Sequence, residues 1–203
     1  DGTDVSTGVS PDCNSNGVPD ECDVLPGVHF TAPRHFAVGV APHVIVAADL
    51  DGDGDRDLVT SDRADDALSV LLNDGKGSFS APITLPVGDQ PRGIAAGDLD
   101  GDDDLDVVSG NGDEDGLGDL PTSSVLLNAG GGSFAPRVDH RALEAQASAL
   151  RSVNLADIDG DRDLDIVNGF SDGALTGTPG GAISLLLGDG RGAFSKPVAI
   201  TAA

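Results

Sequence analysis

The sequence predicts an all-β fold made of three repeated units, each a propeller-type blade of four antiparallel strands. Two observations carry this prediction. An acidic nine-residue loop occurs three times, as DLDGDGDRD from Asp49 to Asp57, DLDGDDDLD from Asp98 to Asp106 and DIDGDRDLD from Asp157 to Asp165. Similar short apolar runs surround every copy, and runs this short, bounded by Gly, Asp and Asn, form strands rather than helices. Four runs per unit is the composition of a propeller blade.

The elements of a unit follow one another in a fixed order. The first strand precedes the acidic loop, at 43–48, 93–97 and 152–156, and the second follows it, at 58–60, 105–109 and 164–168. A third strand, at 68–72, 124–127 and 183–187, leads into a Gly-rich turn that ends in Phe79, Phe134 or Phe194. A Pro-containing stretch then supplies the fourth strand. The units therefore span about 41–88, 89–140 and 150–203.

Each acidic loop has the outline of a calcium loop. Acidic side chains stand at positions 1, 3, 5 and 9, Gly at position 4 allows a sharp turn, and the carbonyl of position 7 can add an oxygen. Solvated acidic turns are the alternative, but three copies in the same strand context favour metal sites. Ca²⁺ is favoured over Mg²⁺, because Mg²⁺ keeps several of its waters and these loops offer many protein oxygens.

On this order of strand, acidic loop, strand and LLN-turn-GSF hairpin, the region from Val28 to Ala203 resembles the FG-GAP/VCBS repeat, the blade of integrin-alpha-type β-propellers. The resemblance implies one Ca²⁺ in each loop. The implied side-chain ligands are Asp49, Asp51, Asp53 and Asp57; Asp98, Asp100, Asp102 and Asp106; and Asp157, Asp159, Asp161 and Asp165. Position 7, which is Asp55, Asp104 or Asp163, is implied to bind through its main-chain carbonyl.

Position 6 of the loop departs from that pattern. It is Gly54 in the first loop but Asp103 in the second and Arg162 in the third. The family's loop often places Gly there for an unusual backbone angle, so we expect the second and third sites to be looser.

The strand count leaves one element over. The segment from His29 to Gly39 matches the fourth strand of a unit, although no three strands precede it. Three blades are fewer than the four to eight of a closed propeller. A piece of a longer propeller, a propeller completed between chains and an open array all remain possible. We expect a homo-oligomer or polymer that uses the orphan strand 29–39 and the blade edges.

One insertion between units has a different composition. Arg141–Arg151 is the only segment with helix-favouring residues, and at most a short helix is expected there.

Residues 1–27 form a separate region, a polar tether followed by a second kind of calcium loop. This loop has EF-hand spacing, with Gly17 at position 6, and its predicted ligand positions are Asp12, Asn14, Asn16, Val18, Asp20 and Asp23. Over these dozen residues it is similar to the loops of dockerins and thrombospondin type 3 repeats, and a fourth Ca²⁺ is expected in it. A disulfide between Cys13 and Cys22 would clamp the loop and would require an oxidising compartment; two reduced thiols are the alternative.

Composition narrows the partners and the location. The chain has 35 acidic and 11 basic side chains and a net charge of −24, which argues against nucleic acids and anionic membranes as partners. No apolar run approaches the roughly 20 residues of a membrane span. The chain contains no Met and begins at Asp1, so we interpret it as a processed form or a fragment and expect an extracellular or cell-surface protein.

No catalytic motif is present, and we expect a protein that is not an enzyme. The four histidines, the Gly-rich turns and the serines match no metal-ligand pair, phosphate loop or GxSxG motif. One remaining class is a calcium-binding structural or adhesive protein that assembles head to tail into an extracellular fibre. The other is a lectin-like or adhesin module, part of a longer propeller, that binds a glycan or a protein through 111–123 and 171–182. The absence of Trp and Tyr disfavours a sugar platform and favours the structural class.

Overall fold

The computed structural model describes residues 33–112, 120–143, 150–171 and 182–200. The chain divides into two compact units, Asp1–His35 and Phe36–Ala203, and all twelve described strands belong to the second. The predicted N-terminal calcium loop, with Cys13 and Cys22, lies outside the described residues.

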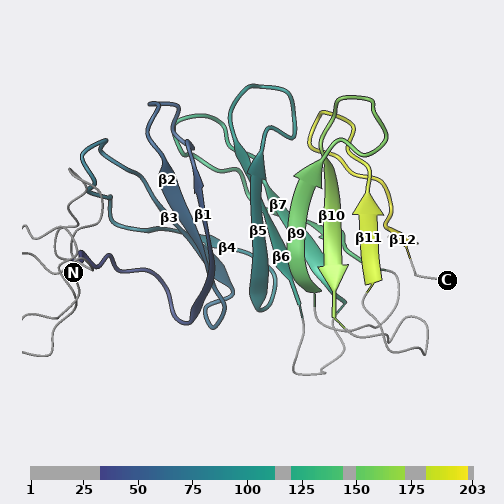
Figure 1. The fold of residues 1–203 in the computed structure, drawn as a ribbon, viewed down its shortest axis with the longest axis horizontal. Coiled ribbons are helices and arrows are strands. Elements are labelled where there is room, and N and C mark those ends of the chain that lie inside the picture. Colours follow the sequence, from purple (N-terminus) through teal and green to yellow (C-terminus); the bar gives the residue numbers. More distant parts are fainter. Residues whose placement is uncertain (1–32, 113–119, 144–149, 172–181, 201–203) are drawn as a thin grey trace, which may run out of the picture. The chain divides into compact units, whose positions relative to one another are not determined.

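The strands form three four-stranded antiparallel sheets, which confirms the predicted all-β fold of four-stranded units. Each sheet takes its strands in chain order, and we call the sheets blades 1, 2 and 3 (Figure 1). Blade 1 contains β1 Pro42–Ala48, β2 Asp57–Asp62, β3 Ala67–Leu71 and β4 Ile83–Pro86; blade 2 contains β5 Pro91–Gly97, β6 Asp106–Asn111, β7 Thr122–Leu126 and β8 Val138–Arg141; blade 3 contains β9 Leu150–Ala156, β10 Asp165–Phe170, β11 Ala182–Leu186 and β12 Val198–Ile200.

The blades follow one another as separate sheets that pack face to face. The first strands β1, β5 and β9 lie side by side, and no strand ladder joins one described sheet to the next (Figure 1). The described strands thus make a stack of three blades and do not close into a ring.

Aliphatic side chains fill the space between neighbouring blades. Between blades 1 and 2 the buried cluster consists of Ala48, Leu50, Val59, Leu68, Val70, Val87, Ile94, Val107 and Leu126. Between blades 2 and 3 it consists of Leu99, Val108, Val125, Val153, Ile166 and Leu186. Because burying one such side chain contributes about 1.5–3 kcal/mol, these two interfaces supply much of the cohesion of the stack.

The expected orphan strand is not a strand over its described part. Residues 33–39 lie outside the twelve strands, and residues 29–32 are outside the described part of the chain. The physical reason is that a fourth strand needs a third strand beside it, and blade 1 already uses β4 in that place.

The segment predicted as a short helix is described only at its ends. Arg141 closes β8 and Leu150 opens β9, while residues 144–149 are not described. The described residues of the chain contain no helix.

Candidate metal centres

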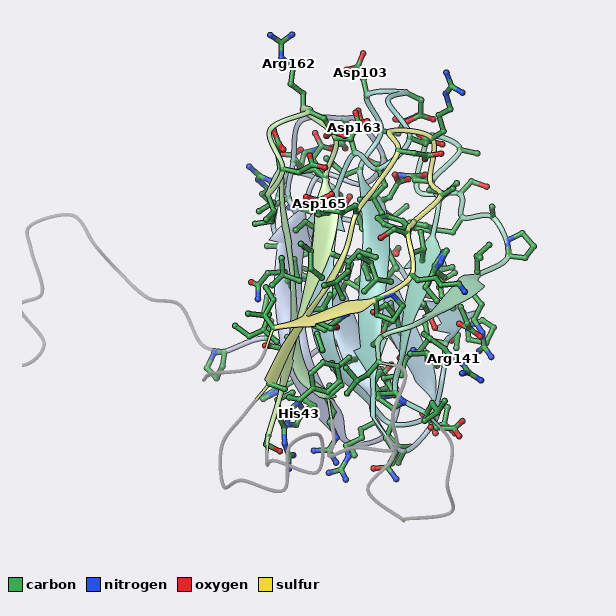
Figure 2. The ribbon with its side chains drawn as sticks, turned by 90° about the vertical axis from the view of Figure 1, so that its right-hand side faces the viewer. His43, Asp103, Arg141, Arg162, Asp163 and Asp165 are labelled. Carbon is green, nitrogen blue, oxygen red and sulfur yellow. The ribbon has the colours of Figure 1, made fainter. Side chains whose placement is uncertain are left out.

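Each acidic loop joins the first and second strands of its blade. The antiparallel pair on either side of the loop closes it, because the position 9 Asp is also the first residue of the second strand: Ala48 pairs with Asp57, Gly97 with Asp106 and Ala156 with Asp165. Repeated topology therefore places the loops along one side of the stack, at the same ends of the strands in every blade. Figure 2 shows Asp103, Arg162, Asp163 and Asp165 on that side, away from His43 and Arg141.

The position 1 carboxylate shapes the loop backbone. In the first loop the two Asp49 oxygens accept hydrogen bonds from the amides of Gly52 and Gly54, at 2.9 and 3.0 Å. Asp98 and Asp157 accept the corresponding pairs of bonds in the other loops. Side-chain to backbone bonds of this kind hold a tight turn, so the three loops share one backbone conformation.

Position 6 keeps that conformation even without glycine. The φ angles are 93° at Gly54, 72° at Asp103 and 83° at Arg162. Non-glycine residues rarely adopt such angles because Cβ crowds the backbone. The replacement of glycine by Asp103 and Arg162 therefore leaves the loop conformation unchanged and introduces local backbone strain.

The loops bring carboxylates together, although not the same ones each time. One oxygen from each of three side chains lies within 4.8 Å of the other two, and the groups are Asp49, Asp51 and Asp53; Asp98, Asp100 and Asp106; and Asp157, Asp159 and Asp165. Asp57 is absent from the first group, and Asp102 and Asp161 are absent from the other two. Asp102 and Asp161 accept a bond from the amide two residues later, at 3.0 and 2.9 Å, and Asp53 does the same within the first group.

The position 9 carboxylate is fully buried and ties the loop to the hairpin after the third strand. Asp57 accepts bonds from the amides of Leu50 and Asn73, at 2.8 and 2.7 Å. Asp106 does the same with Leu99 and Asn128, and Asp165 with Ile158 and Gly188. This residue therefore has a structural task whether or not a metal is bound.

The position 7 carboxylate turns away from the cluster. A Cβ added to hairpin residue Gly130 would lie 3.1 Å from Oδ2 of Asp104, and one added to Gly190 would lie 2.5 Å from Oδ1 of Asp163. The side chain of Asp55 lies against Gly75 in the same way. This placement leaves the main-chain carbonyl as the group that position 7 can offer to a cation.

The electrostatics of the clusters fit a hard cation. Burial raises the pKa of Asp100, and the neighbouring charges of Asp102 and Asp98 raise it further. Burial is also the largest influence raising the pKa of Asp106, to about 6, despite two backbone hydrogen bonds that lower it. Oδ1 of Asp100 is buried and has no hydrogen-bond partner among the described residues. A divalent cation would satisfy that oxygen and favour the charged carboxylates, and an all-oxygen donor set suits Ca²⁺.

Sequence reasoning missed one residue that links two of these centres. Nδ2 of Asn128, in the blade 2 hairpin, donates to the carbonyl of Leu50 in the first loop at 2.7 Å and to the carbonyl of Leu105 at 3.1 Å. The LLN pattern marked Asn128 as a turn residue only. Its reach into the neighbouring blade could not be foreseen without knowing which blades pack together.

Other predicted sites are only partly visible. The N-terminal ligand set Asp12, Asn14, Asn16, Val18, Asp20 and Asp23 lies outside the described residues. Most of the two loops offered as ligand surfaces, 111–123 and 171–182, also lies outside them. In the described part of the chain, no helix is long and apolar enough to span a membrane.

Comparison with known proteins confirms the repeat. Residues 49–109, which include the first two acidic loops, match the family model of the FG-GAP-like repeat. No curated protein matches the chain. Among solved structures it is similar to the crystal structure of the Vibrio cholerae (V. cholerae) biofilm matrix protein Bap1, with 19% identity and a TM-score of 0.36. That similarity covers 78% of this chain and 28% of Bap1, so the chain spans less than a third of that protein's length.

Proposed function

We propose that this chain, whose residues 49–109 carry an FG-GAP-like repeat, is a secreted, non-enzymatic structural or adhesive protein stiffened by Ca²⁺. One observation carries the proposal. The same acidic loop is built three times on the same pair of strands, and each copy gathers three carboxylates within 4.8 Å. Gathering like charges costs free energy, and a cation is the ordinary means of recovering it.

Hydrogen bonds connect the first and second acidic loops to the next blade. Leu50 follows the first ligand position, and its carbonyl accepts bonds from Gly132 N and from Asn128 Nδ2 of blade 2. Leu99 in the second loop accepts a bond from Gly192 N of blade 3. Ca²⁺ would supply charge neutralisation and fixed oxygen geometry at the loops, and these bonds would carry that rigidity to the next blade.

The proposal extends to assembly outside the cell. Copies would join head to tail into a fibre or ring, because heterologous contacts either close or continue indefinitely. The predicted disulfide of Cys13 with Cys22 and a fourth Ca²⁺ in the N-terminal loop fit an exported protein.

The first test is thermal unfolding, followed by far-UV circular dichroism, in Ca²⁺ and in EDTA. Three sites at a hundredfold ligand excess over Kd add about 8 kcal/mol, which corresponds to a shift in Tm on the order of 20 °C. Asp51→Asn should shrink this shift, because it removes a first-loop carboxylate. The matched control Asp89→Asn makes the same charge change at an exposed residue outside the loops and should leave it intact. Equal melts with and without Ca²⁺ would refute the proposal.

A further inference from the structure

At each end of the blade stack, an apolar face is exposed that is buried between blades inside the stack. We define the front face of a blade as the one toward the preceding blade and the back face as the one toward the next. On the front face of blade 1, Ile45 is 60% exposed, whereas its equivalents Ile94 and Val153, also four residues before an acidic loop, are 6% and 4% exposed. The difference arises because no described blade covers blade 1 in front.

This front face is hollowed. A hollow of about 360 Å³ lies on it, lined mainly by apolar side chains that include Phe36, Val38, Pro42, Ile45, Leu58 and Leu71. The residues equivalent to Leu58 are Val107 in blade 2 and Ile166 in blade 3, and both are fully buried against the preceding blade. The hollow is therefore the empty counterpart of an interface that the chain makes twice.

The back face of blade 3 is the matching half. Ile158 is 53% exposed, while its equivalents Leu50 and Leu99 are 1% and 3% exposed under the next blade's hairpin. Ile183 is 47% exposed, while its equivalent Leu68 is fully buried. Val198 and Ile200 pair directly with Leu185 and Ile183, and directly paired residues share a face, so they extend this apolar surface.

Residues 36–39 occupy the position that the outer strand of a preceding blade would take. The ring of Phe36 meets Phe79 edge to face at 5.0 Å, as His140 in the outer strand of blade 2 meets Phe194 of blade 3 at 5.2 Å. Gly39 N donates to Ser69 Oγ at 3.2 Å, as Gly88 N, just after β4, donates to Ser124 Oγ at 3.1 Å. The segment ending at Gly39 thus makes the contacts of an outer strand, and a sheet docking in front of blade 1 needs only three strands of its own.

We propose that the front face of blade 1 receives blade 3 of a second copy, whose outer strand β12 gives its place to the segment ending at Gly39. This names the partner surface for the head-to-tail assembly of the proposed function and rests on it. β12 suits the exchange because it is the most weakly paired outer strand. It pairs with β11 at three residues, whereas β4 pairs with β3 and β8 with β7 at four residues each. All residues of β12 are also exposed. The second copy is favoured as the occupant because its blade 3 presents the face that the joint requires.

The faces are tested in the full chain with Ca²⁺ by sedimentation velocity over a concentration series. Ile45→Asp and Ile183→Asp should each lower the association constant on the order of 100-fold or more, because each buries an unpaired charge in the joint. The control Val138→Asp changes a residue whose exposure, 53%, lies between those of Ile45 and Ile183, on the outer strand of blade 2, and should leave association unchanged. An equimolar mixture of the two face variants should form 1:1 dimers that grow no further, because each supplies the intact face that the other lacks.

The strand exchange is tested by Ala199→Pro, which removes the amide of the central β12 residue paired with Ser184. It should strengthen association several-fold by freeing the edge of β11. Thr84→Pro is the matched control, because Thr84 pairs with Ser69 at the equivalent position of blade 1, where the chain continues into blade 2. It should lower stability without strengthening association.

The outcomes separate this inference from the proposed function. Rings or fibres that are lost in both face variants support the inference. A chain that stays monomeric at every concentration while retaining its Ca²⁺-dependent melt overturns it and leaves the proposed function standing. Association that survives both face variants, or that Ala199→Pro weakens, also overturns it.

Discussion

Arg162 and Asp103 carry a cost that the first loop avoids with Gly54. All three have positive φ, but only glycine adopts that region without crowding Cβ. Arg162, with φ 83°, extends outward from the side of the stack that carries the acidic loops in Figure 2. The loop conformation is therefore held in place by its surroundings, chiefly the bonds from its backbone to Asp157.

Replacing Arg162 by Gly should stabilise the protein by about 1 kcal/mol, because relief of left-handed strain exceeds the added entropy of the unfolded chain. Urea unfolding in Ca²⁺ measures the change. Gly54→Arg is the reciprocal control and should destabilise by a similar amount. If both substitutions had no effect, position 6 would not be strained.

Asp106 makes the metal-free protein sensitive to pH. Because burial raises its pKa to about 6 from the usual 3.8, folding favours the protonated form when no metal is bound. The resulting contribution to stability is present below pH 4 and is lost as the pH rises through about 6. In EDTA, the free energy of unfolding should therefore fall over this range more for the wild type than for Asp106→Asn. Ca²⁺ should cancel the difference in slope, because metal binding requires the deprotonated carboxylate.

At the scale of elements, the hairpin after the third strand is the connector between blades. The hairpin residues Gly132 and Gly192, both with positive φ, lie so close to Leu72 and Leu127 of the preceding blade that an added Cβ would meet those side chains at 3.1 and 2.8 Å. Their amides bond the preceding acidic loop at 3.0 Å. The Gly-rich turn thus serves a close packing contact as well as the reversal of the chain.

The two hairpin asparagines allow that connection to be measured. Among the described residues, Asn73 Nδ2 donates only to the carbonyl of Arg56 in its own blade, at 3.0 Å, whereas Asn128 also reaches Leu50 of the preceding blade. Asn128→Ala should therefore destabilise the chain by about 1 kcal/mol more than Asn73→Ala. Chemical denaturation of both variants gives the comparison. Equal losses would mean that the bond to Leu50 contributes nothing.

The strands could be predicted because their signals are local. Runs such as 43–48 and 58–60 fall within β1 and β2, and the hairpins close at the predicted Phe79, Phe134 and Phe194. The repeated spacing also marks the acidic residues of the three loops, and the structure brings three carboxylates together in each loop. Their binding of Ca²⁺ stays a prediction. The double bonding of Asp57 and the cross-blade reach of Asn128 depend on packing between segments far apart in sequence, which no local pattern encodes.

At the scale of the whole molecule, the stack has a defined direction. Every joint sets the back face of one blade on the front face of the next, and the acidic loops all lie on one side of the stack. The segment ending at Gly39 lies in front of blade 1, where the outer strand of a preceding blade would lie. The sequence could not reveal this position. The strand expected in this segment is replaced by the Phe36 and Gly39 contacts because the sheet that it would complete is not among the described blades.

The repeated joint also makes the chain behave like a short one-dimensional lattice. Among the three described blades, contacts between sheets run from blade 1 to blade 2 and from blade 2 to blade 3, so only the middle one has a described neighbour on both sides. In such a system local opening begins at the ends. Amide hydrogen exchange of the monomer in Ca²⁺ should therefore be slowest in β5–β7 and faster in the corresponding strands of both outer blades. Joining copies would make every blade internal, and the same experiment would then show uniform protection along the chain.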